Sequence, residues 1–440
     1  MTKEQELLKK YYGYENFRPG QEKIISNILS GKDVLGIMPT GAGKSVCYQI
    51  PSLILPGITI VISPLISLMK DQVDYLNKIG IPSAYVNSSL SKNLLSRVLE
   101  NISKNSYKII YISPERLELS EFIHFLQKLN ISMITVDEAH CISQWGHDFR
   151  KSYLKISSAI KKLPSRPIVS AFTATATEIV KNDIIKLLDL HNPYILTTGF
   201  DRENLRFYTC TPNNKLQFIL EYIRAKLGLS GIIYCSTRKN VNSIFQKLSF
   251  MGFSVSKYHG GMNEKERATN QNEFILNKTN IMVATNAFGM GINKPNIRYV
   301  IHYNMPKDLE NYYQEAGRAG RDGKNSECIL LFSEEDIKLN KYLIKSSTSL
   351  SNCKLELDKL NSMIKYCNMD TCLRKFILEY FGEKPSFNRC NNCSNCLNYT
   401  FPYEFASKKN KKTGIFDGLD EKSNLFEIFQ FLIKKIFNLW

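Results

Sequence analysis

Residues 34–45, VLGIMPTGAGKS, join a continuous apolar run to a glycine-rich turn. A run without polar alternation predicts a strand that is buried on both faces of a parallel sheet. The first two hundred residues contain four more such runs, separated by amphipathic stretches long enough for crossover helices: 58–64, 108–114, 133–138 and 168–174. The sequence therefore predicts an α/β domain with a parallel sheet over residues 1–200.

The same pattern restarts after residue 200. Apolar runs begin at residues 231, 255, 281, 297 and 328, which predicts a second α/β domain over residues 201–335. The strand pattern then ends, and helical spacing over residues 336–400 predicts a small helical unit with a cysteine-rich end. Residues 401–440 combine a basic linker with the stretch LFEIFQFLIKKIFNLW, which predicts an apolar C-terminal helix.

The composition is that of a folded chain with several domains. Its 440 residues are 43% hydrophobic and 22% charged, and no uncharged apolar run reaches the roughly 18 residues of a membrane span. Lys and Arg outnumber Asp and Glu by 58 to 41, so the net charge is +17. That surplus suits a polyanionic partner or a solvated surface. Because the amino-terminal residues lack the apolar segment of a signal peptide, we expect a cytoplasmic protein.

The glycine-rich turn has the composition of a phosphate-binding loop. The backbone amides of Gly41 and Gly43 can face phosphate oxygens, Lys44 can place its ammonium against them, and the Ser45 hydroxyl can bind Mg²⁺. The residues of this turn that we predict to bind nucleotide are Thr40, Gly41, Gly43, Lys44 and Ser45. A strict pattern has glycine at position 38, and we expect Met38 to lie at the end of the strand instead.

Two further segments carry charged groups suited to nucleotide hydrolysis. After an apolar run, Asp137 can hold Mg²⁺ and Glu138 can orient or deprotonate water. Arg318 and Arg321 lie one helical turn apart in a glycine-punctuated segment at the end of the second domain. If both domains face one cleft, these guanidiniums can stabilise charge on a γ phosphate; the alternative is a surface ion pair.

Taken together, these segments resemble a known set of motifs. DEAH at 137, FTATAT at 172, ATNAFGMGI at 284 and QEAGRAGRDG at 314 are similar, in this order, to the motifs of superfamily 2 helicases. The resemblance to the RecQ family of DNA helicases covers residues 7–397 and includes FRPGQ at 17, SPLISLMKDQV at 63, SPERL at 113 and GMGINKP at 289. It implies two tandem RecA-like domains followed by a small helical zinc-binding domain.

The resemblance also implies an activity. It implies an ATP-dependent helicase that uses ATP, Mg²⁺ and Zn²⁺, moves 3′ to 5′ on single-stranded DNA and unwinds tailed duplex DNA in recombination and repair. The expected place is the cytoplasm, or the nucleoid in a bacterium, and the expected state is a monomer. The alternatives are a DNA-stimulated translocase that unwinds weakly, an inactive zinc-containing DNA-binding protein and a motor that acts on RNA.

Family likeness assigns roles to further positions. Around FRPGQ, Tyr14, Arg18 and Gln21 would contact adenine. The family's mobile aromatic-rich loop falls on residues 143–150, where the candidate DNA contacts are Ser143, Gln144, Trp145, His147, Phe149 and Arg150. Aromatic faces stack on bases without reading their sequence, whereas the alternative for Trp145 is core packing. Lys151 stands where many relatives have proline, so a different exit from the loop is possible.

Four cysteines predict a metal site. Cys390, Cys393 and Cys396 are spaced CxxCxxC, and Cys372 lies 18 residues before them. Four thiolates suit closed tetrahedral zinc coordination, and a redox-active pair is the alternative. Cys367 is a competing ligand, but the family's zinc-binding domain resembles the set that begins with Cys372.

The segment after the cysteines departs from longer relatives of the family. Only 44 residues follow Cys396, too few for the winged helix and the further nucleic-acid-binding domain that we would expect there. We expect residues 425–440 to dock on the body, to begin an incomplete winged helix or to bind a protein partner. A short stretch with Lys434 and Lys435 is not expected to span a membrane.

Overall fold

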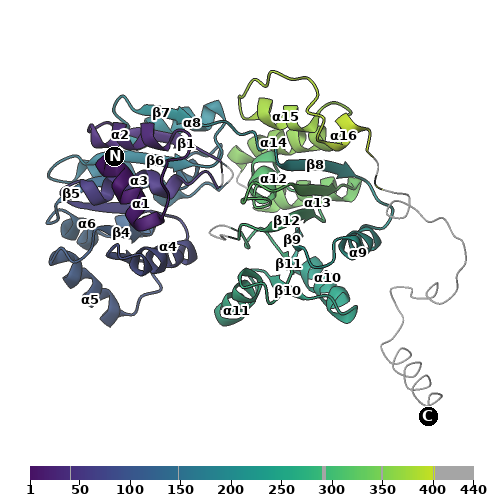
Figure 1. Ribbon diagram of the computed structural model, residues 1–440, viewed down its shortest axis with the longest axis horizontal. Helices are drawn as coiled ribbons and strands as arrows, with labels where there is room; N and C mark the ends of the chain where they lie inside the picture. Colours follow the sequence, from purple (N-terminus) through teal and green to yellow (C-terminus); the bar gives the residue numbers. More distant parts are fainter. Residues whose placement is uncertain (40, 147, 290–293, 348–349, 400, 402–440) are drawn as a thin grey trace, which may run out of the picture.

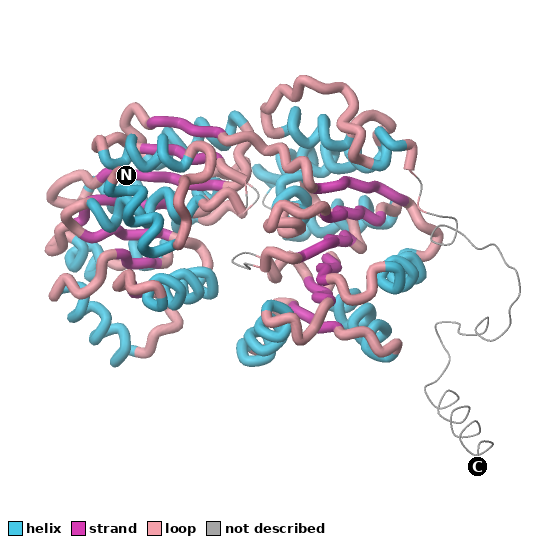
Figure 2. The backbone as a smooth tube through the Cα atoms, in the orientation of Figure 1, coloured by secondary structure: helices cyan, strands magenta, loops and turns pink. Residues whose placement is uncertain are grey.

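Two α/β halves lie side by side, and a helical unit packs on the second half (Figure 1 and Figure 2). The structure is a computed structural model that describes residues 1–39, 41–146, 148–289, 294–347, 350–399 and 401. The predicted C-terminal helix, residues 425–440, lies outside the described residues. Within the described ranges, no helix is long and apolar enough to cross a lipid bilayer.

The first half contains a sheet of seven parallel strands in the order β3-β4-β2-β5-β6-β1-β7. Their bounds are β1 (Val34–Ile37), β2 (Ile58–Ile62), β3 (Ser83–Val86), β4 (Ile109–Ile112), β5 (Ile131–Val136), β6 (Ile168–Thr173) and β7 (Tyr194–Thr197). Five of these strands are the predicted apolar runs, whereas the edge strands β3 and β7 were not predicted. Every residue of β1, β2 and β4 is buried, as expected for strands covered on both faces.

Helices and short 3₁₀ turns connect the strands of the first half. They are α1 (Lys3–Tyr12), α2 (Gln21–Leu29), α3 (Lys44–Ile54), α4 (Ile66–Lys78), α5 (Lys92–Ser103), η1 (Pro114–Glu118), α6 (Ser120–Leu126), η2 (Ala139–Ile142), η3 (Lys151–Lys155), α7 (Ile156–Lys161) and α8 (Glu178–Leu188). The glycine-rich turn follows β1 and the acid pair follows β5. Both motifs therefore lie at the carboxyl edge of one parallel sheet, where such sheets bind ligands.

The second half repeats this architecture with six parallel strands in the order β10-β11-β9-β12-β13-β8. The strands are β8 (Leu205–Cys210), β9 (Ser230–Tyr234), β10 (Val255–Tyr258), β11 (Ile281–Ala284), β12 (Ile297–His302) and β13 (Ser326–Leu331). The helices are α9 (Lys215–Ala225), α10 (Arg238–Phe250), α11 (Glu264–Ile275) and α12 (Leu309–Ala316). The five predicted runs form β9 to β13, and β8 is an additional edge strand.

The helical unit covers the edge strand β8. It consists of α13 (Glu334–Ser347), α14 (Leu350–Asn368), α15 (Leu373–Tyr380) and α16 (Ser394–Leu397). Arg374 donates to the Asp201 carboxylate at 2.8 Å and to the backbone oxygen of Leu205. Cys393 pairs with Phe207 in an isolated parallel bridge. The unit thus protects a strand edge that would otherwise present unpaired backbone groups.

Candidate active site

The glycine-rich turn lies between β1 and α3. Gly41 and Gly43 have φ angles of +90° and +82°, a left-handed conformation that side chains disfavour. Gly43 is also the N-cap of α3 and offers no side-chain cap, so the first amides of the helix are open to an anion. Met38 is fully buried at the strand end, as expected. Thr40 lies outside the described residues.

Lys44 lies among the predicted acidic residues. Its ammonium donates to the Met38 carbonyl at 3.0 Å. Burial lowers the pKa of Lys44, and the charges of Glu138 and Asp137 oppose that shift. Burial, then the charge of Glu138, raises the pKa of Asp137 to about 7. A divalent cation beside Asp137 and Ser45 would relieve the repulsion between the two carboxylates, so these residues fit Mg²⁺.

A histidine for which we predicted no role ties the acid pair to the neighbouring strand. His140 Nδ1 lies 2.9 Å from Thr173 Oγ1 and 3.4 Å from Glu138 Oε2. Thr173 ends β6 inside the FTATAT segment, so two motifs that are far apart in sequence meet through this imidazole. The sequence could have indicated this contact, because DEAH contains the polar residue His140 and FTATAT contains the polar residue Thr173.

The second half supplies two guanidiniums. Arg318 is only 4% exposed and donates to the Gly289 carbonyl, so a surface ion pair does not describe it. The side chain of Arg321 lies against the turn of the first half, where a Cβ added to Gly41 would meet it at 3.6 Å. Burial, then the charges of Arg318 and Arg202, lowers the pKa of Arg321 to about 9. The second half therefore reaches the glycine-rich turn.

Two of the three residues predicted to contact adenine, Arg18 and Gln21, lie beside the same turn. Gln21 is buried, and its amide donates to the Gly43 carbonyl at 3.0 Å. Arg18 donates to the Gly41 carbonyl. The Tyr14 ring is 56% exposed, so it is open for stacking. Arg18 and Gln21 thus also hold the backbone of the turn, a use that the sequence did not predict.

Residues 143–150, which we call the aromatic loop, connect η2 to η3. Ser143 is buried, and its hydroxyl donates to the Asp183 carboxylate at 2.6 Å and accepts the backbone N–H of Trp145 at 3.1 Å. The Trp145 ring is 43% exposed, so core packing is not its role. Asp183 lies in α8 and was not predicted, since nothing in its local sequence marks it.

The remaining residues of the aromatic loop have mixed exposure. Arg150 donates to the Pro64 carbonyl at 2.8 Å, which ties the loop to the SPLISLMKDQV segment. Gln144 is exposed and Phe149 is partly buried. His147 lies outside the described residues. The loop therefore presents Gln144 and Trp145 to solvent on a base fixed by Ser143 and Arg150.

The exit from the aromatic loop leads back to the acid pair. Arg150 has a φ of −129°, the extended backbone that a residue before proline also adopts, and η3 begins at Lys151. The backbone conformation of Arg150 is therefore one that a following proline would also allow. The Tyr153 hydroxyl of η3 donates to the backbone oxygen of Asp137 at 2.9 Å. A displacement of the loop can therefore reach the predicted magnesium ligand.

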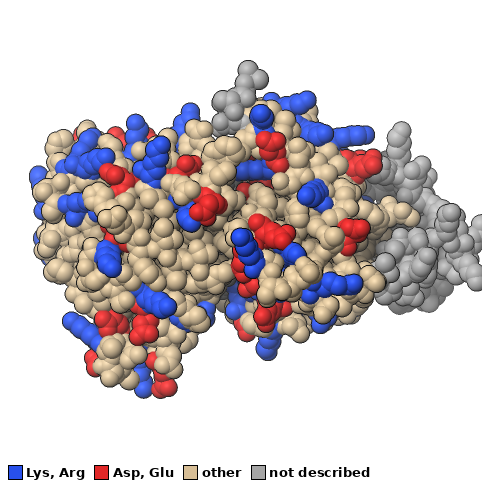
Figure 3. Space-filling model, turned by 90° about the horizontal axis from the view of Figure 1, so that it is seen from above, with Lys and Arg blue, Asp and Glu red and all other residues tan. Residues whose placement is uncertain are grey.

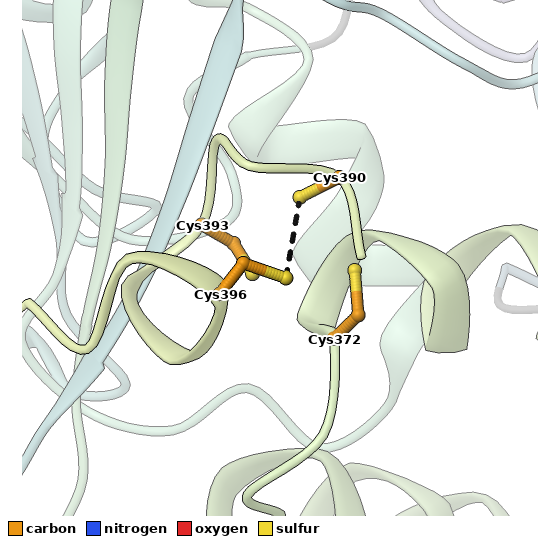
Figure 4. Close-up of side chains that lie close together, drawn as sticks. All are labelled: Cys372, Cys390, Cys393 and Cys396. Carbon is orange, nitrogen blue, oxygen red and sulfur yellow. Dashed lines mark hydrogen bonds between the residues drawn. The ribbon is translucent and has the colours of Figure 1, made fainter. Parts of the chain in front are cut away.

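The four predicted zinc ligands converge. The sulfur atoms of Cys372, Cys390, Cys393 and Cys396 lie within 4.8 Å of one another, and those of Cys390 and Cys396 are 3.9 Å apart (Figure 4). Sulfur atoms bound tetrahedrally at 2.3 Å would be about 3.8 Å apart, so the spacing fits Zn²⁺. The hydrogen bond between Cys390 and Cys393 lowers the pKa of Cys393 and raises that of Cys390, so one thiolate of this pair is favoured. Cys367, the competing candidate, is not in this group.

A second candidate surface for contact with nucleic acid lies on the second half. A hollow of about 180 Å³ opens beyond the carboxyl ends of β9 and β12, and its polar lining includes Ser236, Asn286, Asn304 and Lys307. On the face seen in Figure 3, Lys and Arg side chains are spread over both halves, with Asp and Glu between them. This face therefore shows no single continuous basic path.

Three family models match the chain in the expected order. The DEAD/DEAH box helicase family matches residues 18–182, the helicase conserved C-terminal domain matches residues 214–323, and the RecQ zinc-binding family matches residues 334–397. The ATP-dependent DNA helicase RecQ of Bacillus subtilis is 48% identical over 393 residues, 89% of this chain. The chain belongs to the RecQ helicase family. Helicases of this family use ATP and Mg²⁺, and the zinc-binding match accords with the four-cysteine group.

The relatives of this RecQ-family chain differ in length and in the nucleic acid that they are named for. The match covers 66% of the Bacillus subtilis protein, so the chain spans just under two thirds of that relative. A relative from Acanthamoeba polyphaga mimivirus, whose name places it among ATP-dependent RNA helicases, is 44% identical over 89% of this chain and 71% of its own length.

Solved structures show the same fold at low identity. Saccharomyces cerevisiae Dbp5 bound to RNA and ADP BeF3 matches with a TM-score of 0.63 and 19% identity, covering 82% of this chain and 98% of that chain. A likeness at this identity concerns the fold alone. Together with the two parallel sheets and the family matches, it confirms the predicted tandem RecA-like halves and the zinc-binding unit that follows them.

Proposed function

We propose that this RecQ-family chain is an ATP-dependent DNA helicase that moves 3′ to 5′ on single-stranded DNA and unwinds tailed duplexes in recombination and repair. The contact between Arg321 of the second half and the glycine-rich turn of the first supports it most. A nucleotide site built from both halves couples nucleotide binding and release to their relative movement. The RecQ zinc-binding match and the names of the bacterial relatives favour DNA as the substrate.

Each charged group of the site has one task in hydrolysis. Lys44 and the open amides at the start of α3 bind phosphate oxygens, and Glu138 accepts a proton from the attacking water. Arg318 and Arg321 stabilise the charge that develops on the transferred phosphate. Ser45 and Asp137 would hold Mg²⁺, which would supply positive charge at the same phosphates. The adenine contacts are Tyr14, Arg18 and Gln21.

The strand path runs from the aromatic loop to the hollow of the second half. Trp145 and Phe149 stack on bases, and Arg150 and Lys307 place positive charge beside the backbone phosphates without regard to sequence. Ser143, Gln144 and His147 complete the loop surface. Because the loop leaves the acid pair and returns to it through Tyr153, a bound strand affects the groups that perform hydrolysis.

Zinc has a structural role in this proposal. Zn²⁺ held by the four cysteines would fix α15 and α16 against β8. We also propose that the protein is a monomer that acts in the cytoplasm, at the nucleoid in a bacterium. For residues 425–440 we propose docking on the body or the start of an incomplete winged helix, with binding of a protein partner as the alternative. Light scattering after size exclusion, with the chain intact and truncated before residue 413, tests the oligomeric state and that segment.

Displacement of a labelled strand from 3′-tailed and 5′-tailed duplexes tests the proposal, with Lys44→Ala as the control. We expect displacement of the 3′-tailed substrate alone, and none by the variant. DNA-stimulated hydrolysis without displacement would instead support a weakly unwinding translocase. Stimulation by RNA and not by DNA would support the RNA motor, which the name of the mimivirus relative favours. Folded protein without any hydrolysis would contradict the enzyme.

A further inference from the structure

Lys359 is a buried lysine at which three parts of the chain meet. It lies in α14 of the helical unit and is only 6% exposed. Its ammonium donates to the carbonyl of Gly146 in the aromatic loop at 3.1 Å. The same ammonium lies 4.0 Å from the Glu310 carboxylate of α12 and 3.9 Å from the Glu356 carboxylate of α14. One side chain therefore contacts the first half, the second half and the helical unit.

The surroundings of Lys359 make this contact specific. A buried ammonium is costly unless it is paired, and two carboxylates here compensate it. Glu356 is itself held by Lys307 at 3.0 Å, so the carboxylates belong to an ordered network. On the other side, the Gly146 backbone is fixed by its N–H bond to the Ser143 carbonyl at 2.9 Å. The hydrogen bond within the loop therefore orients the Gly146 carbonyl that accepts from the Lys359 ammonium.

The groups on either side of Lys359 are connected along the chain to residues of the proposed hydrolysis site. Gly146 follows Trp145 in the aromatic loop, whose exit contacts the backbone of Asp137 through Tyr153. Glu310 lies in α12, which leads into the segment of Arg318 and Arg321. The lysine stands between the loop that leaves the acid pair and the helix that precedes the arginines.

We propose that Lys359 is a positioning residue that holds the aromatic loop against α12 and α14 when no nucleic acid is bound, so that nucleic acid must break the Lys359–Gly146 hydrogen bond to move the loop. The role of the loop rests on the proposed function above, whereas the contact does not. Release is inexpensive, because the freed ammonium finds two carboxylates already near it. Burial, then the charge of Asp308, raises the pKa of Glu310, and the charge of Lys359 opposes that rise, so the lysine favours the ionised form of this carboxylate.

Trp145 is a fluorescent reporter of the position of the aromatic loop. The chain has two tryptophans, so Trp440→Phe leaves Trp145 alone, one residue before Gly146. In that background we compare Lys359→Met with Lys354→Met, which removes an exposed lysine of the same helix. Without nucleic acid, we expect Lys359→Met to raise acrylamide quenching of Trp145 about twofold, from a ring that is 43% exposed toward full exposure. Lys354→Met should quench like the parent.

Two further variants keep the test valid if Lys359→Met folds poorly. Lys359→Arg retains a cation and should restore most of the parent's quenching. Glu310→Gln with Lys359→Met removes the uncompensated carboxylate, should fold with the parent's zinc content and should still show the raised quenching. Parent-like quenching in either folded Lys359→Met protein would overturn the proposal.

Hydrolysis gives a second readout. If the loop is held by Lys359, its release should raise ATP hydrolysis without DNA by about fivefold, the low end of measured couplings, while the rate at saturating oligo-dT stays near that of the parent. The ratio of stimulated to basal rate then falls by the same factor. If the parent does not respond to DNA at all, the proposed function fails, and the quenching experiment still decides the role of Lys359.

Discussion

The two α/β halves have the same architecture but end their central strands differently. After β1 the chain makes a turn with two left-handed glycines, and α3 begins at a glycine that provides no cap. After β9 the chain reads CSTRKN, and Thr237 caps α10 by accepting the N–H of Asn240 at 3.1 Å. The first half leaves a helix terminus open to an anion, whereas the second closes its own.

This difference explains how two similar halves divide the work. Of the two helices that follow β1 and β9, α3 has open backbone amides for phosphates and α10 is capped by a side chain, so we expect the second half to contribute through side chains. It does so with Arg321, which lies against the open turn of its neighbour. The helical unit and its cysteines support the second half, where they cover the edge strand β8. The comparison predicts which changes damage one half and spare the other.

The largest effect concerns zinc. Cys393→Ser should abolish zinc binding and unfold the helical unit, because metal binding to such sites contributes on the order of 10 kcal/mol to folding. Proteolysis should then cut residues 334–397 while residues 1–200 stay protected, with zinc content measured in parallel. Cys353→Ser, outside the cysteine group, is the matched control. Unchanged zinc content in Cys393→Ser would contradict the site.

The next effect separates the two halves in catalysis. Arg321→Ala should lower kcat about 10³-fold or more with little loss of ATP affinity, since an arginine finger acts on the transition state. Lys44→Ala should lose both binding and hydrolysis. Steady-state hydrolysis measures kcat, and nucleotide titration measures ATP affinity. The control is Arg224→Ala, which removes an exposed arginine of α9. An equal loss of affinity in Arg321→Ala would show that it binds the ground state as well.

The two helix starts can be compared directly. Gly43→Ala places a side chain at a φ of +82° and against the Gln21 amide, so we expect ATP affinity to fall about tenfold from backbone strain. Thr237→Ala should leave ATP affinity unchanged and lower the free energy of unfolding by about 1 kcal/mol, the usual cost of a lost cap. Nucleotide titration and urea unfolding of both proteins test this. Lower ATP affinity in Thr237→Ala would mean that the second half also binds phosphate through its helix terminus.

A further effect of similar size is a pH dependence in the second half. Burial, then the charge of Asp308, raises the pKa of Glu310 from 4.5 to about 7, while Lys359 and Tyr380 oppose the shift. The folded state therefore binds the proton more tightly, and this stability is full below pH 4.5 and lost as the pH rises through about 7. Relative to the parent, Glu310→Gln should gain about 1–2 kcal/mol between pH 5 and 8.

Thermal unfolding of the parent and Glu310→Gln across that range measures the difference. Asp358→Asn, which changes an exposed carboxylate of α14, should show no such trend. A difference between Glu310→Gln and the parent that does not vary with pH would mean that Glu310 titrates as an exposed group.

The sequence predicted the fold where the strands are central. Nine of the ten apolar runs became the interior strands β1, β2, β4, β5, β6, β9, β11, β12 and β13, because strands covered on both faces need continuous apolar residues, and the tenth became the edge strand β10. The edge strands β3, β7 and β8 were not predicted. Edge strands bury less: Tyr194–Thr197 is only partly buried at best, so its sequence carries a weaker pattern.

The residues of the candidate site also divide into those that the sequence predicted and those that it did not. Turn residues such as Gly41 and Gly43, and the cysteine spacing, were predictable because local geometry dictates the residue type. The partners Asp183 and Lys359 were not, because each acts through a contact with a loop distant in sequence. From sequence alone, a single charged residue on a helix that contacts a distant loop cannot be distinguished from one that faces solvent.

The central claim is that one nucleotide site is formed by both halves of one chain. The most direct test is DNA-stimulated ATP hydrolysis by the parent, by Lys44→Ala, by Arg321→Ala and by an equal mixture of the two variants. We predict strong stimulation in the parent, a loss of about 10³-fold in each variant and no recovery in the mixture. Parent-like hydrolysis by Arg321→Ala, or recovery in the mixture, would contradict the claim.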